Sequence, residues 1–235
     1  MSIKLSKRLQ TIASFISSNS LFADIGSDHA YLPCYVCLSD QTVQAIAGEV
    51  KEGPLKRAQE TVEYYDLSER IDVRLGNGLQ IINENDHVNE VVIAGMGGSL
   101  IANIMEEGKN KLSAVHKIIA QPNIHASSVR KTFLANNYSL INEIILMENN
   151  HIYEVLVAER DSTVNIYDPA EHLGKQLMFG PLLMQEKSPV FIKKWQDERK
   201  KLLHITSNME KAKNKEETKL HLYKKQLQWM EEVLT

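Results

Sequence analysis

Residues 21–32, LFADIGSDHAYL, decide the fold of this chain. The first three are apolar and lead to the acid Asp24, a pattern typical of a short buried strand. Gly26 then allows a tight turn, and a helix follows. A strand, a glycine turn and a helix form the nucleotide pocket at the carboxyl end of the first strand in an open α/β sheet. The stretch therefore predicts a nucleotide-binding site.

The charge of this turn indicates which nucleotide would bind. Gly26 is its only glycine, so the G-x-G-x-x-G pattern is absent, and the carboxylates Asp24 and Asp28 flank it. A pyrophosphate binds backbone N–H groups and is repelled by nearby acids, which disfavours NAD and ATP. The acids favour a ligand that carries a cation, such as the ammonium and sulfonium groups of S-adenosylmethionine (AdoMet). The alternative is a polar turn that binds nothing.

The next two predicted strands also end in polar groups. Residues 43–50 form a strand in which Glu49 lies 23 residues beyond the turn glycine. A carboxylate at the end of the second strand accepts hydrogen bonds from the ribose hydroxyls of a nucleoside. Residues 71–75 form the third strand, before the sequence G-N-G at 76–78. Glycine on both sides allows Asn77 to approach an adenine edge, although N-G is also frequent in plain turns.

The fourth and fifth predicted strands reach the same edge. Residues 90–94, EVVIA, are a continuous apolar run, which is typical of a central parallel strand, and the glycines at 95–98 leave space for a ligand. Residues 117–120 form the next strand, and the amides Gln121 and Asn123 follow it. Ligands of open α/β sheets bind at the carboxyl ends of the strands, so we expect both amides in the crevice. The alternative is a plain proline-led loop.

Two alternating runs, residues 139–148 and 152–159, are joined by an Asn-rich link and predict a β-hairpin. Parallel strand–helix units closed by an antiparallel hairpin are the layout of class I AdoMet-dependent methyltransferases, which the chain resembles over about residues 10–160. We therefore predict an α/β fold with a Rossmann-like domain in residues 1–162. A C-terminal helical coiled-coil hairpin is expected in residues 163–235.

The C-terminal region has a helical pattern and its own charge balance. Residues 190–212 and 215–234 are predicted helices. In the second helix, apolar residues recur at spacings of four and three, as in a coiled-coil seam: Leu220, Tyr223, Leu227, Met230 and Leu234. Residues 187–235 hold 12 basic and 7 acidic side chains, against 15 and 23 in the rest. A basic region on an acidic body predicts contact with a polyanion, and the alternative is a dimer or scaffold hairpin.

Composition excludes several classes of protein. The chain has 235 residues and a net charge of −3, and no run of 18 apolar residues could span a membrane. The cysteines Cys34 and Cys37 lack a second pair that could close a zinc site, so we expect them to pack within a helix. Two cysteines and an N-terminal stretch of helical rather than signal-peptide pattern predict a cytoplasmic protein.

The motifs LSKRL, ADIGSDHAYLP, AGEV, GNGL, IAGMGG and QPN follow one another, and the predicted coiled coil closes the series. This series resembles the bacterial tRNA (adenine-22-N1)-methyltransferases, the TrmK family, over almost the whole chain. The resemblance implies an enzyme that transfers the methyl group of AdoMet to N1 of adenosine 22 in tRNA and leaves S-adenosyl-L-homocysteine. It also implies a monomer or weak dimer whose helical hairpin helps to hold the tRNA.

The motifs and the resemblance together give three groups of candidate residues. Cofactor binding is expected from the strand ends: Asp24, Gly26, Ser27, Asp28, His29, Glu49, Val50, Asn77, Gly78, Ala94, Gly95, Met96 and Gly97. Polar residues expected beside the methyl group are the catalytic candidates: Asp28, His29, Gln121 and Asn123. RNA contacts are expected from Lys7, Arg8, Tyr31, Lys193, Lys194, Arg199 and Lys200. No metal is expected, because neutral adenine N1 can attack the methyl group directly.

Two other functions remain compatible with the sequence. One is an AdoMet-dependent methyltransferase for another RNA, a protein or a small molecule, with the C-terminal helices as a dimer seam. The other is a module that binds AdoMet and RNA without turnover. Removal of residues 163–235 separates the first from the tRNA enzyme, because a basic hairpin that holds tRNA would lose RNA affinity whereas a dimer seam would lose mass in solution. Methyl transfer separates the second.

Overall fold

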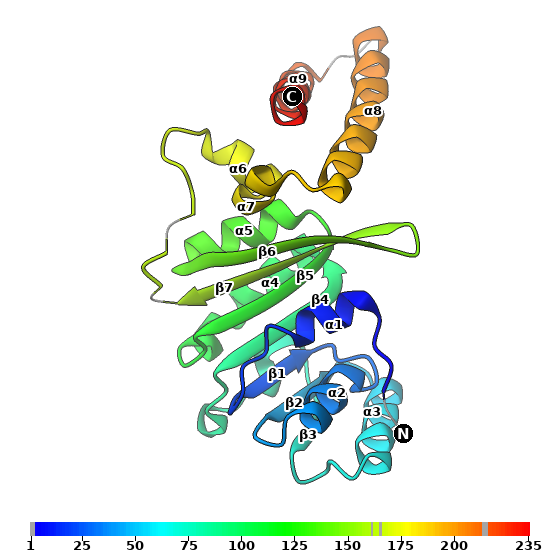
Figure 1. Cartoon of the computed structure of the whole chain (residues 1–235), viewed down its shortest axis with the longest axis vertical. Helices are drawn as coiled ribbons and strands as arrows, with labels where there is room; N and C mark the ends of the chain where they lie inside the picture. The colour runs from blue at the N-terminus through cyan, green and yellow to red at the C-terminus, as the bar shows by residue number, and fades with distance from the viewer. Residues whose placement is uncertain (1–2, 161, 165, 213–215) are drawn as a thin grey trace.

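A seven-stranded sheet runs through the middle of the molecule (Figure 1). The computed structural model describes residues 3–160, 162–164, 166–212 and 216–235. The strands are β1 (Leu21–Ile25), β2 (Gln44–Glu49), β3 (Ile71–Leu75), β4 (Glu90–Gly97), β5 (Lys117–Ile124), β6 (Tyr138–Glu148) and β7 (His151–Arg160). Their order is β3-β2-β1-β4-β5-β7-β6. β7 runs antiparallel to both β5 and β6, and the other pairings are parallel. The predicted sheet, mostly parallel and closed by a hairpin, is confirmed.

Helices cover both faces of the sheet. They are α1 (Lys7–Ala13), α2 (Tyr31–Ser39), α3 (Glu52–Tyr64), α4 (Gly98–Glu107) and α5 (Ala126–Ala135). In Figure 1, α1, α2 and α3 lie in front of the sheet and α4 and α5 lie behind it. Each face has its own hydrophobic cluster, and Cys34 and Cys37 of α2 are fully buried in the front one.

The central strand β4 shows why its sequence is continuously apolar. Val91 and Ile93 pack into the cluster behind the sheet, whereas Val92 packs into the cluster in front of it. Successive side chains of a strand point to opposite faces, so a strand covered on both sides needs apolar residues at every position. All three side chains are fully buried, as expected for the middle of a doubly covered sheet.

Two strands are longer than their sequence pattern predicts. β4 continues to Gly97, with irregular pairing after Ala94, and β5 continues to Ile124. Residues 121–123, expected in a loop after the strand, therefore belong to β5. The Met96–Pro122 pairing lies in the irregular part of the ladder, where a proline without an N–H is tolerated.

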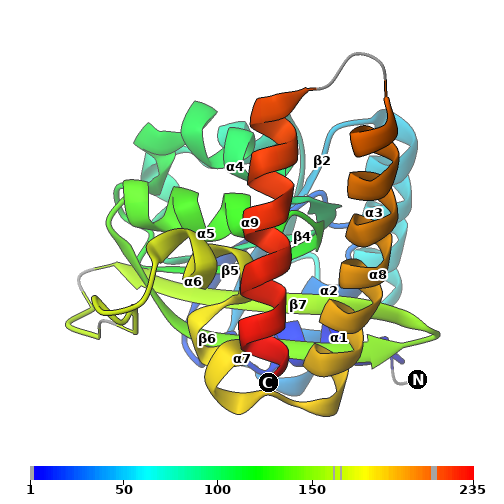
Figure 2. The same ribbon diagram turned by 90° about the horizontal axis from the view of Figure 1, so that it is seen from above.

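The C-terminal helices stand above β6 in Figure 1. They are α6 (Leu173–Phe179), α7 (Pro181–Glu186), α8 (Pro189–Lys211) and α9 (Glu217–Leu234). Figure 2 shows α8 and α9 side by side and running in opposite directions. No helix was predicted from the sequence in the region of α6 and α7. Lys215, the expected first residue of the last helix, lies outside the described residues.

A third hydrophobic cluster joins these helices to the sheet. Phe179, Trp195 and Met230 are buried in it together with Ile145 of β6. Leu220 of the predicted seam is also buried. The other seam residues, Tyr223, Leu227 and Leu234, are half-buried, and Val233, which the predicted seam did not include, is buried. None of the helices in the described part of the chain is long and apolar enough to span a membrane.

A buried charge network lies beneath this cluster. The guanidinium of Arg130, on α5, donates from Nε to Glu143 Oε1 and from Nη2 to Glu154 Oε2, each at 2.6 Å. Burial opposes the charge of Arg130, but the two carboxylates outweigh it and raise the pKa of the guanidinium. Burial raises the pKa of Glu143, whereas Lys194 and Arg130 overcome burial and lower that of Glu154. The charged forms of Arg130 and Glu154 are therefore favoured, whereas burial disfavours the charged form of Glu143.

The same network holds the C-terminal helices in place. Arg130 Nη1 donates to the carbonyl of Leu177 in α6 at 3.2 Å, and the amide of Leu182 in α7 donates to Glu143 Oε2 at 3.0 Å. Lys194 of α8 donates to Glu154 Oε1. One arginine thus links α5 and the hairpin strands to three C-terminal helices.

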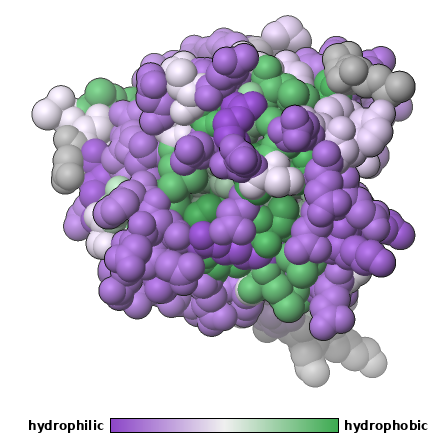
Figure 3. Space-filling model, turned by 90° about the horizontal axis from the view of Figure 1, so that it is seen from below, coloured by the Kyte–Doolittle hydropathy of each residue, from purple (hydrophilic) through white to green (hydrophobic). Residues whose placement is uncertain are grey.

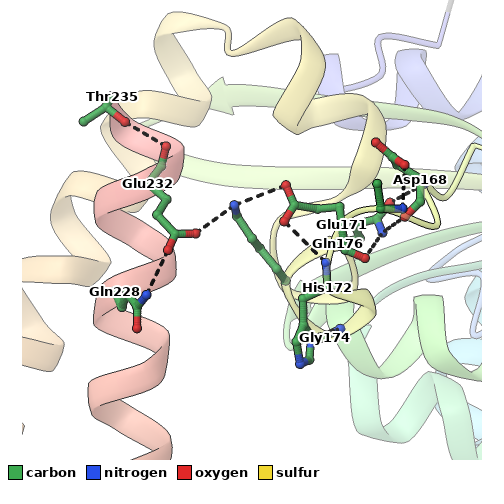
Figure 4. A network of polar contacts seen from close by, with 10 residues as sticks. Asp168, Glu171, His172, Gly174, Gln176, Gln228, Glu232 and Thr235 are labelled. Atoms are coloured by element: carbon green, nitrogen blue, oxygen red, sulfur yellow. Dashed lines mark hydrogen bonds and ion pairs between the residues drawn. The ribbon is translucent and has the colours of Figure 1, made fainter.

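A second polar network fastens α9 to the segment around α6 (Figure 4). Lys175 Nζ lies 2.9 Å from Glu232 Oε2 and 3.3 Å from Glu171 Oε2. Gln176 exchanges two hydrogen bonds of 2.8 Å with the backbone of Asp168. Figure 4 shows the carboxylates of Glu171 and Glu232 facing each other from the two segments. The last helix is therefore held by Lys175 of α6.

The free edge of the sheet, at β3, is charged. Arg74 of this strand forms ion pairs with Asp72 and Asp86. The end of the molecule where β3 and α3 lie shows hydrophobic residues surrounded by hydrophilic ones (Figure 3). Charged side chains on an edge strand hinder pairing with a second chain, so they protect this partly apolar end.

Replacement of Arg130 by Met should destabilise the protein strongly. The change leaves Glu143 buried without its guanidinium, and removal of one partner from a buried ion pair costs about 3–5 kcal/mol. Urea unfolding followed by circular dichroism measures the loss. Arg199→Met is the matched control, because its partner Glu231 is exposed and a surface pair contributes about 0–1 kcal/mol. Equal losses in both variants would contradict a structural role of the buried network.

Candidate active site

The turn after β1 has an unusual backbone. Gly26 has φ +71°, and its amide and that of Ser27 donate to the carbonyl of Gly48 at 3.0 Å. A Cβ on Gly26 would lie 2.6 Å from Met96 Cε, a flexible side-chain end that can shift, but any other residue would strain the left-handed backbone at this position. Asp28 and His29, together with the next residue, also have positive φ, at 49°, 72° and 58°. Left-handed backbone at non-glycine residues costs about 1–3 kcal/mol each and is concentrated at functional sites.

Asp24 is a buried carboxylate that lacks a full counter-charge. Its Oδ2 accepts a hydrogen bond of 2.6 Å from Ser27 Oγ. Burial is the main cause that raises the pKa of Asp24 to about 7, and the hydrogen bond from Ser27 acts in the opposite direction. The neighbouring charges of Glu49 and Asp28 also contribute to the raised pKa. Arg8 lowers it only slightly. The site therefore favours either a proton or an added cation at Asp24.

Glu49 closes the neighbouring strand at the same edge. It is the last residue of β2 and is buried, and the amide of His29 lies 3.4 Å from its Oε1. Asn77 follows β3 and is exposed, at the start of a short 3-10 helix whose first residue, Gly78, has φ +55°. Val50, another predicted contact, is 62% exposed. A second acid thus lies beside the turn that carries Asp24.

Two amide side chains hold the loop after β4. Gly95 has φ +76°, and its amide donates to Gln121 Oε1 at 3.1 Å while its carbonyl accepts from Asn123 Nδ2 at 2.7 Å. Gln121 Nε2 donates to Asn123 Oδ1 at 3.1 Å. Gln121 is fully buried, so its amide fixes the loop from below. The predicted catalytic candidates Gln121 and Asn123 are brought together by the structure, bound to the backbone of Gly95.

Arg8 reaches the site from α1. Both carboxylate oxygens of Glu148, at the end of β6, accept from the first turn of this helix, at 2.8 Å from the amide of Lys7 and 3.3 Å from that of Arg8. The Arg8 guanidinium donates to Gln121 Oε1 and lies 5.4 Å from the centre of the Tyr153 ring. Arg8 was expected to contact RNA, and the structure places it among the residues that line the site.

These elements enclose a cavity of about 620 Å³. The predicted cofactor residues that line it are Asp24, Gly26, Ser27, Asp28, Ala94, Gly95 and Met96. It is also lined by Arg8, Tyr31 and Asn123 from the other predicted groups. His29, Glu49, Val50, Asn77, Gly78 and Gly97 are not among its lining residues. Ligand cavities of small molecules span about 300–1,000 Å³, so this one has a suitable size.

Sequence reasoning missed the far wall of the cavity. This wall consists of Leu9 of α1, Ile124 of β5, and His151, Ile152 and Tyr153 of β7. The hairpin was predicted, but nothing local in its sequence shows which residues turn towards the cavity. The pairing of His151 with Glu148 across the hairpin places this segment beside α1, a contact between distant parts of the chain.

The predicted RNA-contacting residues of α8 are largely paired with acids. Lys193 and Lys200 both approach Asp197, yet their side chains remain 55% and 76% exposed. Lys194 is the partner of Glu154, and Arg199 pairs with Glu231 in α9. A groove of about 560 Å³ lies between α8 and the ends of β5 and the hairpin, and it is lined by Lys193, Lys194 and Lys201.

The described residues contain no group of three or more His, Cys, Asp or Glu side chains arranged to hold a metal ion. His29 Nε2 lies 3.4 Å from Asp28 Oδ1, and its ring packs edge-on against Tyr31. The side chain of Asp28 is 88% exposed at the cavity rim. The site therefore has acids, amides and aromatic rings around an open cavity.

Comparison with known proteins agrees with this geometry. The family "TrmK: tRNA (adenine(22)-N(1))-methyltransferase" matches residues 22–232. The tRNA (adenine(22)-N(1))-methyltransferase of Bacillus subtilis is 44% identical over 94% of this chain and 92% of its own. The crystal structure of B. subtilis TrmK superposes with a TM-score of 0.94, at 42% identity over 100% of both chains.

A third relative carries a ligand. The structure of Streptococcus pneumoniae Sp1610 in complex with S-adenosyl-L-methionine has a TM-score of 0.85 and 39% identity, and the match covers 99% of this chain and 100% of that one. The resemblance of the motifs is therefore confirmed over nearly the full length, with the fold that they predict. The chain belongs to the TrmK family of tRNA methyltransferases.

Proposed function

We propose that this protein methylates N1 of adenosine 22 in tRNA, with AdoMet as the methyl donor. The observation that carries the proposal is the buried carboxylate of Asp24, which lines a cavity of suitable size and favours a cation. AdoMet carries two cations, and membership of the TrmK family supports both the donor and the target. A tRNA substrate also suggests a cytoplasmic location.

The residues around the cavity fit AdoMet. Asp24 would accept hydrogen bonds from the ammonium of the methionine part, in exchange for the proton that burial otherwise favours. The positive φ of Gly26 and Gly95 brings backbone close to the ligand without a Cβ in the way. Glu49 would accept the ribose hydroxyls, and Asn77 would contact the adenine. AdoMet supplies a methyl group on a sulfonium, which adenine N1 displaces in line.

The protein's own part in the reaction is to orient the base and to exclude water. Among the four catalytic candidates, Asp28 has the carboxylate that is free to accept a hydrogen bond from the adenine amine, since it is exposed at the rim of the cavity. Such a bond would also stabilise the cationic product. Gln121 and Asn123 act through Gly95, whose position they fix, and Arg8 shares this support. His29 would shape the turn that presents Asp28.

The tRNA would lie across the cavity and the groove beside α8. Lys193 and Lys200 keep exposed ammonium groups on this helix, and the neutralisation of phosphates by such groups releases counterions. We retain the division into a catalytic domain, residues 1–162, and a helical domain, residues 163–235. In this arrangement the helical domain holds the RNA while the catalytic domain holds the cofactor.

Transfer of labelled methyl from AdoMet to an unmodified tRNA transcript tests the function. We expect labelling of the wild-type transcript and none when adenosine 22 is changed to guanosine, because the N1 lone pair of adenine is absent there. Nuclease digestion should identify the product as 1-methyladenosine. Labelling that persists in the changed transcript would refute the target, and AdoMet binding without labelling of any tRNA would refute the reaction.

Asp24→Asn should stabilise the protein without ligand and weaken its AdoMet binding. The folded-state pKa of Asp24, about 7, exceeds its ordinary value of 3.8, so its contribution to stability is full below pH 3.8 and is lost as pH rises to 7. Above pH 7 the ionised carboxylate then costs on the order of 4 kcal/mol, which the variant recovers. Unfolding by urea between pH 5 and 8 measures this difference.

Calorimetric titration of the same variant with AdoMet gives the second readout. Loss of a charge-assisted hydrogen bond should weaken binding about ten- to hundred-fold. Asp66→Asn is the control, because Asp66 is an exposed acid outside the cavity, and neither quantity should change. Unchanged AdoMet affinity in Asp24→Asn would contradict the proposed role of the carboxylate.

Lys193→Gln, at the exposed lysine that lines the groove, should weaken tRNA binding and lower its salt dependence. One lost phosphate contact reduces the slope of log K against log salt by about 1. Lys219→Gln is the control, because it removes the same charge at the start of α9, away from the groove residues. Binding titrations at several salt concentrations compare the two variants. Equal slopes would show that α8 is not a preferred phosphate contact.

A further inference from the structure

Ile124 is an apolar side chain in an unexpected place. It is the last residue of β5, and it is 61% exposed. It lines both the cavity with Asp24 and the groove beside α8, so it lies on the rim that the two spaces share. A large aliphatic group that is left in water at a boundary between two binding spaces is suited to contact a ligand there.

The backbone of Ile124 is fixed from several sides. A Cβ on Gly98 would lie only 2.1 Å from the carbonyl oxygen of His125 and 2.9 Å from that of Ile124, so the helix α4 begins in direct contact with this segment. His125 has a left-handed backbone, with φ 56°, and α5 begins after it. The preceding Asn123 is bound to Gly95. The side chain therefore projects from a rigid support.

The reaction requires the target base to leave its helix. N1 belongs to the Watson–Crick edge of adenine, which base pairing covers. Enzymes that modify such atoms extrude the nucleotide, at the cost of unstacking. Proteins that open stacked bases frequently insert an aliphatic side chain into the step. The opened RNA needs such a group between the cavity and the bound backbone.

We propose that Ile124 is the wedge that fills the gap left by the extruded adenosine. This inference rests on the proposed function. The cavity would hold the extruded base, and Ile124 would stack on the bases that remain in the helix. The amide of Asn150 and the hydroxyl of Ser127 line the same groove and could meet the base that has lost its partner. Lys193 and Lys201 line the opposite wall of the groove, on the side where the RNA backbone would lie.

Ile124 is a positioning residue in this scheme, so its role depends on the state of the RNA. Ile124→Ala should lower kcat/KM for intact tRNA about ten-fold or more, because the helix then closes again more easily. The loss should fall to about two-fold or less on a tRNA whose nucleotide opposite the target adenosine is replaced by an abasic residue. Ile124→Leu should restore most of the activity on intact tRNA.

The decisive experiment compares wild type, Ile124→Ala, Ile124→Leu and the control Leu134→Ala on both tRNAs. Leu134 is a 39% exposed apolar residue at the end of α5 and lines neither space. A second readout is the fluorescence of 2-aminopurine at the target position, which rises on unstacking and should rise less with Ile124→Ala. AdoMet affinity is measured for each variant and should be unchanged.

The outcomes separate this inference from the proposed function. Equal losses on intact and opened tRNA, or a weakened AdoMet affinity in Ile124→Ala, would overturn the wedge and make Ile124 an ordinary wall of the cavity. Failure of the wild-type protein to methylate either tRNA would instead refute the proposed function. Rescue on the opened tRNA, with full AdoMet affinity and the reduced fluorescence change, would establish the wedge.

Discussion

An uncompensated negative charge at the end of β1 governs this molecule. Asp24 is buried beside the acids Glu49 and Asp28, and only Ser27 and the more distant Arg8 oppose the resulting repulsion. A sequence selected for stability alone would place a neutral residue here. The rest of the fold, above all the doubly covered centre of the sheet, offsets the destabilisation that this carboxylate causes. A cation that binds beside Asp24 removes the destabilisation.

The strained turn after β1 and the loop after β4 position groups around Asp24 from two sides of the cavity. Three successive left-handed residues carry Asp28 to the rim while Asp24 stays at the base of the cavity. Opposite them, the amides of Gln121 and Asn123 hold both backbone groups of Gly95. Gln121 also accepts from Arg8, so one buried amide joins the first helix to the loop. The buried amide of Gln121, which does not line the cavity, thus helps to preorganise it from behind.

Sequence patterns predicted those parts of the structure that local rules determine. The succession of strands along the chain, the glycine turn, the acid of β2 and the terminal hairpin follow from periodicity and turn chemistry. The entry of Arg8 into the cavity could not be predicted, because it depends on Glu148, a residue 140 positions away. The extension of β5 to Ile124 likewise depends on pairing with β4. Helices α6 and α7 were missed because their apolar pattern is short and is interrupted by Gly180.

The buried network of Arg130 has a consequence for how the RNA must bind. Through Glu154 and Lys194, the network connects the β-hairpin to α8. The hairpin forms one wall of the cavity, and α8 forms the opposite wall of the groove. Packed, ion-paired walls resist a change in their spacing. If the spacing between the two walls is fixed, the protein cannot close around the RNA to reach an adenine that stays in its helix. The deformation then falls on the RNA, and a rigidly supported group such as Ile124 is what holds that deformation once it has formed.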